Sequence, residues 1–151
     1  MPTLGFDYDS SYPDTDPFEP QAGGCCTWLP YFNQGMVELP ITLAQDHTLF
    51  VILGRRDERP WLEKARAIRD RGGMALLITH PDYLLEAHWT DVYARFLATF
   101  RDDPTVWQAL PRDVSAWWRR RAESTVEPSG EGWEVTGPAA GEATVRLANA
   151  V

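Results

Sequence analysis

The apolar and polar positions of the chain follow helical and strand periods in turn, which predicts a mixed α/β fold. One stretch is apolar throughout, Met74 to Ile78 (Met-Ala-Leu-Leu-Ile), and this pattern predicts a strand buried on both faces, as in a parallel sheet. It follows the pair Gly72-Gly73 and is closed by His80 and Pro81. Because the loops after parallel strands carry the chemistry of α/β folds, His80 is a candidate functional residue. The alternative is a partly buried histidine that closes a strand end.

Helical spacing of apolar residues predicts four helices. Asp46 is a candidate cap for the first of them, and Pro60 suits the first turn of the second. His88 falls in the apolar stripe of the third and is predicted to be a core or boundary histidine. The four helices are expected over residues 46–53, 60–71, 84–100 and 111–121.

Strand patterns fill much of the remaining chain. Short strands are expected over residues 3–8, 36–39 and 105–110, beside the strand at 74–78. A hairpin is expected from residues 133–136 and 143–148, so we expect two parts, a main body over 1–123 and a connector with a β-hairpin appendage over 124–151. Strands that alternate with helices imply a parallel sheet or barrel, and four body strands are few for a closed barrel.

A long loop between residues 12 and 35 contains several prolines and aromatic residues. Loops of this length without their own helix or strand are usually functional. Its aromatic side chains either pack the loop down or offer flat apolar faces to a sugar ring, and Trp28 and Tyr31 are the candidates for the second role. The adjacent Cys25 and Cys26 are read as two small residues in a Gly-rich turn, with a redox pair as the alternative, and they have no zinc spacing.

Charge narrows the range of partners. The formal net charge is −8, and residues 1–54 contain seven acids with no lysine or arginine. Such a surface repels phosphate backbones, so we expect no nucleic-acid partner. No run reaches the length of a membrane span, and the first residues lack the pattern of a signal peptide. From its sequence the chain is expected to be soluble, and its compartment stays open.

Five segments together resemble one protein family, the polysaccharide deacetylases (the NodB-homology proteins of carbohydrate esterase family 4), in their C-terminal half. The resemblance covers roughly residues 3–122. The Tyr-Asp-Ser-Ser and Glu-Leu-Pro pieces are the more specific ones, and the family's Leu-x-His motif has Ile78 in place of its leucine. The segments are Leu-Gly-Phe-Asp-Tyr-Asp-Ser-Ser at 4–11, Pro-Asp-Thr-Asp-Pro at 13–17, Val-Glu-Leu-Pro at 37–40, Asp-His-Thr-Leu-Phe at 46–50 and Leu-Ile-Thr-His-Pro at 77–81.

The resemblance implies a fold and an activity. The fold would be part of a distorted parallel (β/α) barrel, and the activity would be metal-dependent removal of N-acetyl groups from a sugar polymer. His80 matches the histidine that protonates the departing amine, and Asp9 and Asp46 match acidic positions near the rim of the active site. The family's divalent metal, often zinc, is implied for the complete enzyme only.

The chain departs from the family in its metal site. The family's metal ligands, one aspartate and two histidines, lie in an N-terminal half whose motifs do not occur here, so we expect no metal ligand and no cofactor within this chain. We therefore expect a C-terminal fragment of a longer deacetylase. The alternative is a non-catalytic carbohydrate-binding or structural half-barrel, and open sheet edges would favour self-association of either form.

Overall fold

The structure is a computed structural model that describes residues 4–14 and 27–145. Contacts divide the chain into two compact units, residues 1–108 and residues 109–151. The last helix therefore belongs to the same unit as the β-hairpin, whereas the sequence placed the boundary after residue 123.

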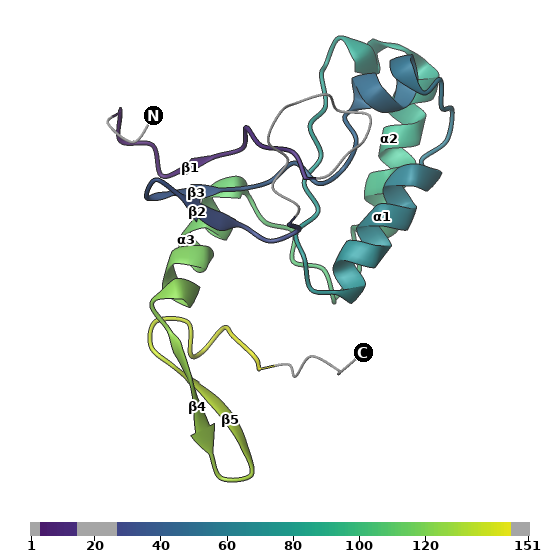
Figure 1. The fold of residues 1–151 in the computed structure, drawn as a ribbon. Coiled ribbons are helices and arrows are strands. Elements are labelled where there is room, and N and C mark those ends of the chain that lie inside the picture. Colours follow the sequence, from purple (N-terminus) through teal and green to yellow (C-terminus); the bar gives the residue numbers. More distant parts are fainter. Residues whose placement is uncertain (1–3, 15–26, 146–151) are drawn as a thin grey trace. The chain divides into compact units, whose positions relative to one another are not determined.

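A three-stranded sheet lies in the first unit (Figure 1). Its order is β1 (Tyr8–Asp9), β3 (Met36–Glu38) and β2 (Tyr31–Asn33); β1 runs parallel to β3 and β2 runs antiparallel to it. Gln34 and Gly35, with φ values of 50° and 85°, form the two-residue turn between β2 and β3. Positive φ at both central positions is the type I′ geometry that matches the twist of a hairpin. The strand predicted over 36–39 is confirmed, and β2 lies in the stretch that the sequence assigned to a loop.

Two long helices lie side by side in the same unit (Figure 1). They are α1 (Arg59–Asp70) and α2 (Ala87–Phe100); the short π-helix η2 (His47–Ile52) precedes α1, and the 3₁₀ turn η3 (Tyr83–Leu85) precedes α2. Trp61 of α1 is 1% exposed, and its ring packs against those of Phe50, Tyr93 and Phe96. These helices confirm the predictions over 46–53 and 60–71, and α2 begins three residues later than predicted.

The strand predicted over residues 74–78 is wrong. The segment has no strand assignment and no fully buried residue. Its polar backbone groups are instead bound by Thr42, whose hydroxyl donates to the carbonyl of Met74 (2.9 Å) and accepts from the N–H of Leu76 (2.8 Å). The N–H groups of Thr42 and Leu43 both donate to the carbonyl of Leu76. The hydroxyl of Thr42 thus supplies two of the hydrogen bonds that a neighbouring strand would supply in a sheet.

Three smaller expectations also differ from the structure. Residues 105–110 form turns and irregular backbone rather than a strand. The first strand is shorter than predicted, because β1 begins at Tyr8. His88 is exposed on α2, and its ring contact in the described part of the chain is with the neighbouring Trp89, so it is not a core histidine. Cys25 and Cys26 lie outside the described residues.

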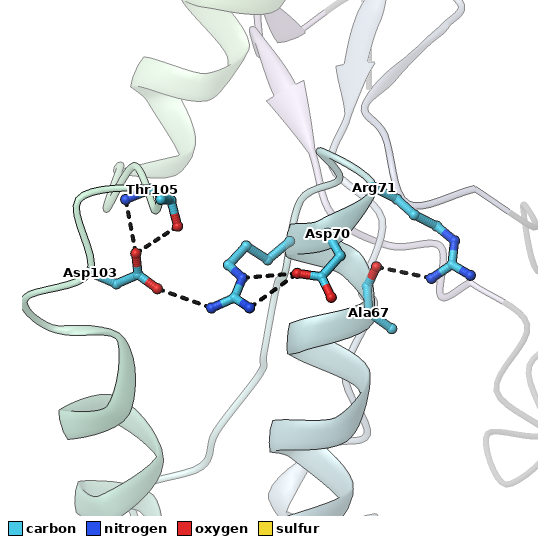
Figure 2. A network of polar contacts seen from close by, with 6 residues as sticks. Ala67, Asp70, Arg71, Asp103 and Thr105 are labelled. Carbon is cyan, nitrogen blue, oxygen red and sulfur yellow. Dashed lines mark hydrogen bonds and ion pairs between the residues drawn. The ribbon is translucent and has the colours of Figure 1, made fainter. Parts of the chain in front are cut away.

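A polar network joins the end of α1 to the turn after α2 (Figure 2). The guanidinium of Arg69 donates to Asp70 (3.1 and 3.2 Å) and to Asp103 (3.1 Å), and Asp103 in turn accepts from the N–H and hydroxyl of Thr105. The bonds from Thr105, and then the cation of Arg69, hold the pKa of Asp103 below its usual value. The network holds the two helix ends together, in addition to the apolar contacts of the helices.

The second unit contains the helix α3 (Pro111–Ala122) and a hairpin of β4 (Thr125–Ser129) and β5 (Gly132–Thr136). The helix confirms the prediction over 111–121. Gly130, with φ 59°, occupies the first turn position of the hairpin, which is typical of a type II′ turn. The hairpin therefore uses the stretch predicted as a connector for its first arm, and residues 143–145, predicted for the other arm, have no strand assignment.

The described residues are a mixture of helices and small sheets, with a single parallel strand pairing between β1 and β3 and one isolated parallel bridge between Pro13 and Ile41. The part-barrel architecture stays a prediction. Among the residues that the structure describes, no helix is both long and apolar enough to cross a membrane.

Candidate functional site

Asp46 and His80, two of the residues proposed from sequence, are in direct contact. Asp46 ends the irregular chain before η2 and is fully buried, and His80 follows the segment 73–79. The Nδ1 atom of His80 lies 2.7 Å from Oδ1 of Asp46, and the backbone N–H of His80 donates to Oδ2 at 2.5 Å. Because an ionised carboxylate only accepts hydrogen bonds, this contact places a proton on Nδ1.

The same carboxylate also caps η2. Oδ1 of Asp46 accepts from the N–H of His47 at 2.8 Å, so the side chain satisfies a backbone donor of the first helical turn. The predicted capping role of Asp46 is confirmed, and the carboxylate has a second role that local sequence does not reveal. One buried side chain fixes both the start of the helix and the position of His80.

The imidazole of His80 is held on one nitrogen and open on the other. Its side chain is 41% exposed, and among the described residues its Nε2 atom has no hydrogen-bond partner. The ring of Tyr83 meets it edge-on at 5.5 Å, and the backbone N–H of Tyr83 donates to the carbonyl of His80. An anchored imidazole with an accessible Nε2 is the arrangement that general acid–base catalysis requires.

A second group of polar residues lies in one row of the sheet. Register places Asp9 and Tyr31 on either side of Glu38, so the three side chains share a face. Glu38 is 1% exposed, and its Oε1 accepts from the N–H groups of Ser11 (2.9 Å) and Tyr12 (3.0 Å). Its Oε2 is buried and without a partner in the described part of the chain.

The pKa of Glu38 is raised, first because burial disfavours the charged carboxylate. The hydrogen bonds from Tyr12 and Ser11 act in the opposite direction, and the nearby charge of Asp9 adds to the rise. Glu38 was not proposed from the sequence. The signal in the sequence was a single acid within an otherwise apolar strand, between Val37 and Leu39.

Trp28 lies in a third place, beside a buried acid. Its indole N–H donates to Oδ2 of Asp14 at 3.1 Å, and the ammonium of Lys64 contacts both oxygens of the same carboxylate at 2.8 and 2.9 Å. Asp14 is only 4% exposed, so this N-terminal acid belongs to a buried ion pair rather than to a solvated loop. Trp28, a candidate for contact with a sugar ring, is thus anchored by its indole nitrogen.

The residues proposed from sequence therefore fall into separate groups. The hydrogen bonds and ring contacts of His80 in the described residues are with Asp46, Tyr83 and Leu84, and none is with Asp9, Trp28 or Tyr31. Asp9 and Tyr31 share a sheet row around Glu38. The pair of Asp46 and His80 is the group with recognisable catalytic geometry.

The divalent metal implied by the resemblance does not fit the described residues. Nowhere in residues 4–14 and 27–145 do three histidine, cysteine, aspartate or glutamate side chains gather as a metal site would need. Both oxygens of Asp46 already accept hydrogen bonds, from His47 and His80. No metal-dependent step is therefore assigned to these residues.

Comparison with known proteins adds no relative. No protein-family model matches the chain, and searches of curated proteins and of solved structures gave no match either.

Proposed function

We propose that this chain supplies the general acid of a polysaccharide deacetylase-like hydrolase, which removes N-acetyl groups from a sugar polymer. The observation that carries the proposal is the contact between His80 and Asp46. Both residues were selected by the resemblance to that family, 34 positions apart in the chain, and their side chains meet at 2.7 Å. The motifs at 46–50 and 77–81 thus meet at one point.

His80 has the chemistry that amide cleavage needs at the leaving group. The amine of a tetrahedral intermediate is a poor leaving group until it is protonated. An imidazolium can donate a proton from Nε2 while Nδ1–H stays bound to the carboxylate of Asp46. Asp46 would then orient the ring and select the nitrogen that faces the substrate. The groups that activate water and polarise the carbonyl are not assigned to described residues.

The test is an assay of acetate release from N-acetylglucosamine oligomers, with the protein expressed from its entire reading frame. His80→Gln, which cannot donate as an acid, should lower the rate about 10²–10⁴-fold. Asp46→Asn should lower it less, and the exposed His88→Gln serves as the matched control and should leave it unchanged.

Two results would contradict the proposal. One is acetate release by His80→Gln at the rate of the natural protein. The other is saturable oligosaccharide binding with no acetate release by any form, which is the expectation for a non-catalytic carbohydrate-binding half-barrel. Circular dichroism of each variant separates loss of chemistry from loss of fold.

A further inference from the structure

A shallow hollow of about 290 Å³ lies at the C-terminal end of α1. It is lined by Thr27, Trp28, Leu29, Arg71 and Gly73. Its volume is close to the lower end, about 300 Å³, of ordinary small-molecule sites, which suits a ligand of a single ring. Gly73 precedes His80 by seven positions, and none of the five residues makes a hydrogen bond or ring contact with His80, so the hollow is separate from the proposed acid.

The polar group of this hollow is Arg71. Its guanidinium carbon lies 5.4 Å from the centre of the Trp28 ring, within the range of a cation–π contact. Of its five N–H donors, one has a partner among the described residues: Nη1 donates to the carbonyl of Ala67 at 3.2 Å. No ion pair of the described residues includes Arg71. A cation with spare donors thus lies over an aromatic wall.

Arg69, two positions earlier in the chain, differs from Arg71 in its partners (Figure 2). Its guanidinium is occupied by the carboxylates of Asp70 and Asp103, whereas Arg71 extends away from that network and contacts a backbone carbonyl. Both arginines complement the negative end of the α1 dipole. That structural role accounts for the bond to Ala67 but not for a hollow beside the remaining donors.

The aromatic wall is held firmly in place. The indole N–H of Trp28 donates to Asp14, and its backbone carbonyl accepts from the N–H of Met74 at 2.7 Å. A Cβ at Gly73 would lie 3.0 Å from Cβ of Trp28 and 2.9 Å from a methyl of Ile68, so a side chain at this position would force its neighbours to shift. A preorganised wall lowers the entropic cost of binding.

We propose that this hollow binds an organic carboxylate carried on a ring. The carboxylate would accept two parallel N–H bonds from Arg71, which is the geometry that guanidinium and carboxylate favour. The ring body would lie against Trp28 and the side chain of Leu29, which is 41% exposed. An apolar wall next to a single cation disfavours a fully hydrated inorganic anion, because burial of that anion would leave most of its oxygens without donors.

The experiment is a titration of the full chain, followed by ¹H–¹⁵N spectra of the Trp28 indole and the Gly73 amide. The probes are sodium D-glucuronate and sodium benzoate, with D-glucose and inorganic phosphate as matched ligands that lack either the carboxylate or the ring. At least one ring carboxylate should shift both signals saturably, and which of the two binds distinguishes a sugar acid from an aromatic acid. Glucose and phosphate should bind at least about tenfold more weakly.

Variants test whether binding depends on the guanidinium of Arg71 or only on positive charge near the hollow. Arg71→Gln should weaken the carboxylate about tenfold or more, Arg71→Lys should be intermediate because it retains charge without the planar fork, and Arg69→Gln should leave the affinity unchanged. The proposal is overturned if neither carboxylate binds, if glucose or phosphate binds equally well, or if Arg69→Gln weakens binding as much as Arg71→Gln. Arg71→Lys keeps the test decisive should Arg71→Gln fail to fold.

Discussion

Asp46 holds His80 through both of its carboxylate oxygens, with Oδ1 at 2.7 Å from the imidazole Nδ1 and Oδ2 at 2.5 Å from the backbone nitrogen. The carboxylate is fully buried, and the ring that it holds is 41% exposed. This difference in burial defines the site: the anchor is shielded from water, whereas the group that it anchors can reach a substrate.

Replacement of Asp46 by asparagine should destabilise the protein and release His80. The amide would place an N–H₂ group against donors that now bind a carboxylate, at a cost of about 1–3 kcal/mol in the free energy of unfolding. Denaturant unfolding measures the cost, and ¹⁵N shifts of the imidazole report whether the proton stays on Nδ1. Asp82→Asn is the matched control, since Asp82 is exposed and makes no side-chain capping bond. Equal behaviour of the two variants would contradict the assigned role of Asp46.

Glu38 should make the protein less stable as pH rises. Burial raises the pKa of Glu38 in the folded state above its value in the unfolded chain, so the folded state binds more protons over that interval. The contribution of this carboxyl to stability is therefore fully present below the unfolded pKa and is lost as pH rises through the folded pKa. Relative to Glu38→Gln, which does not titrate, the natural protein should lose stability between acidic and neutral pH.

Urea unfolding of both forms at several pH values tests this. Glu63→Gln, at an exposed position of α1, provides the control for removal of an acidic charge. The measured quantity is the difference in the free energy of unfolding between the natural protein and Glu38→Gln. If that difference stays constant with pH, or grows in favour of the natural protein as pH rises, burial does not raise the pKa of Glu38.

Trp61 should be costly to alter. Trp61→Phe removes ring volume from a core position and leaves the carbonyl of Ala44 without the indole N–H that reaches it at 2.7 Å. We expect a loss of about 1–3 kcal/mol in the free energy of unfolding. Trp133→Phe, at a side chain that is 53% exposed in the hairpin, should change it by less than about 0.5 kcal/mol. Thermal and denaturant unfolding of the two variants give the comparison directly.

The sequence predicted the helices well because their signals are local. Asp46 caps η2 through its own side chain, and Pro60 occupies the first turn of α1. The segment 74–78 failed for the opposite reason. Its apolar composition is that of a buried strand, but its hydrogen bonds go to Thr42, which is more than thirty positions away. Composition does not reveal which neighbour a segment will find.

The candidate site was predictable in its members but not in its pairing. His80 and Asp46 were both selected from motifs, whereas their contact depends on how the segments before η2 and η3 meet. Glu38 was missed because its raised pKa comes from burial, which local sequence does not report. The hairpin of β2 and β3 had a local signal in Gly35, the second residue of its turn, and the length of the surrounding loop obscured it.

Gly73 is the position where one added methyl group should reveal how tightly Trp28 is held. In Gly73→Ala the new Cβ would lie 2.9 Å from Cγ2 of Ile68, 3.0 Å from Cβ of Trp28 and 3.2 Å from the Trp28 carbonyl oxygen. Two of these neighbours are backbone or Cβ atoms that cannot rotate away, so we expect a loss of about 1–3 kcal/mol in the free energy of unfolding and a shifted indole signal of Trp28. Gly141→Ala, where a Cβ meets nothing within 4 Å, should cost little. If Gly73→Ala proved as stable as the natural protein with an unmoved Trp28 signal, the close passage of the chain at this point would be wrong, and the hollow beside Arg71 would lose its fixed wall.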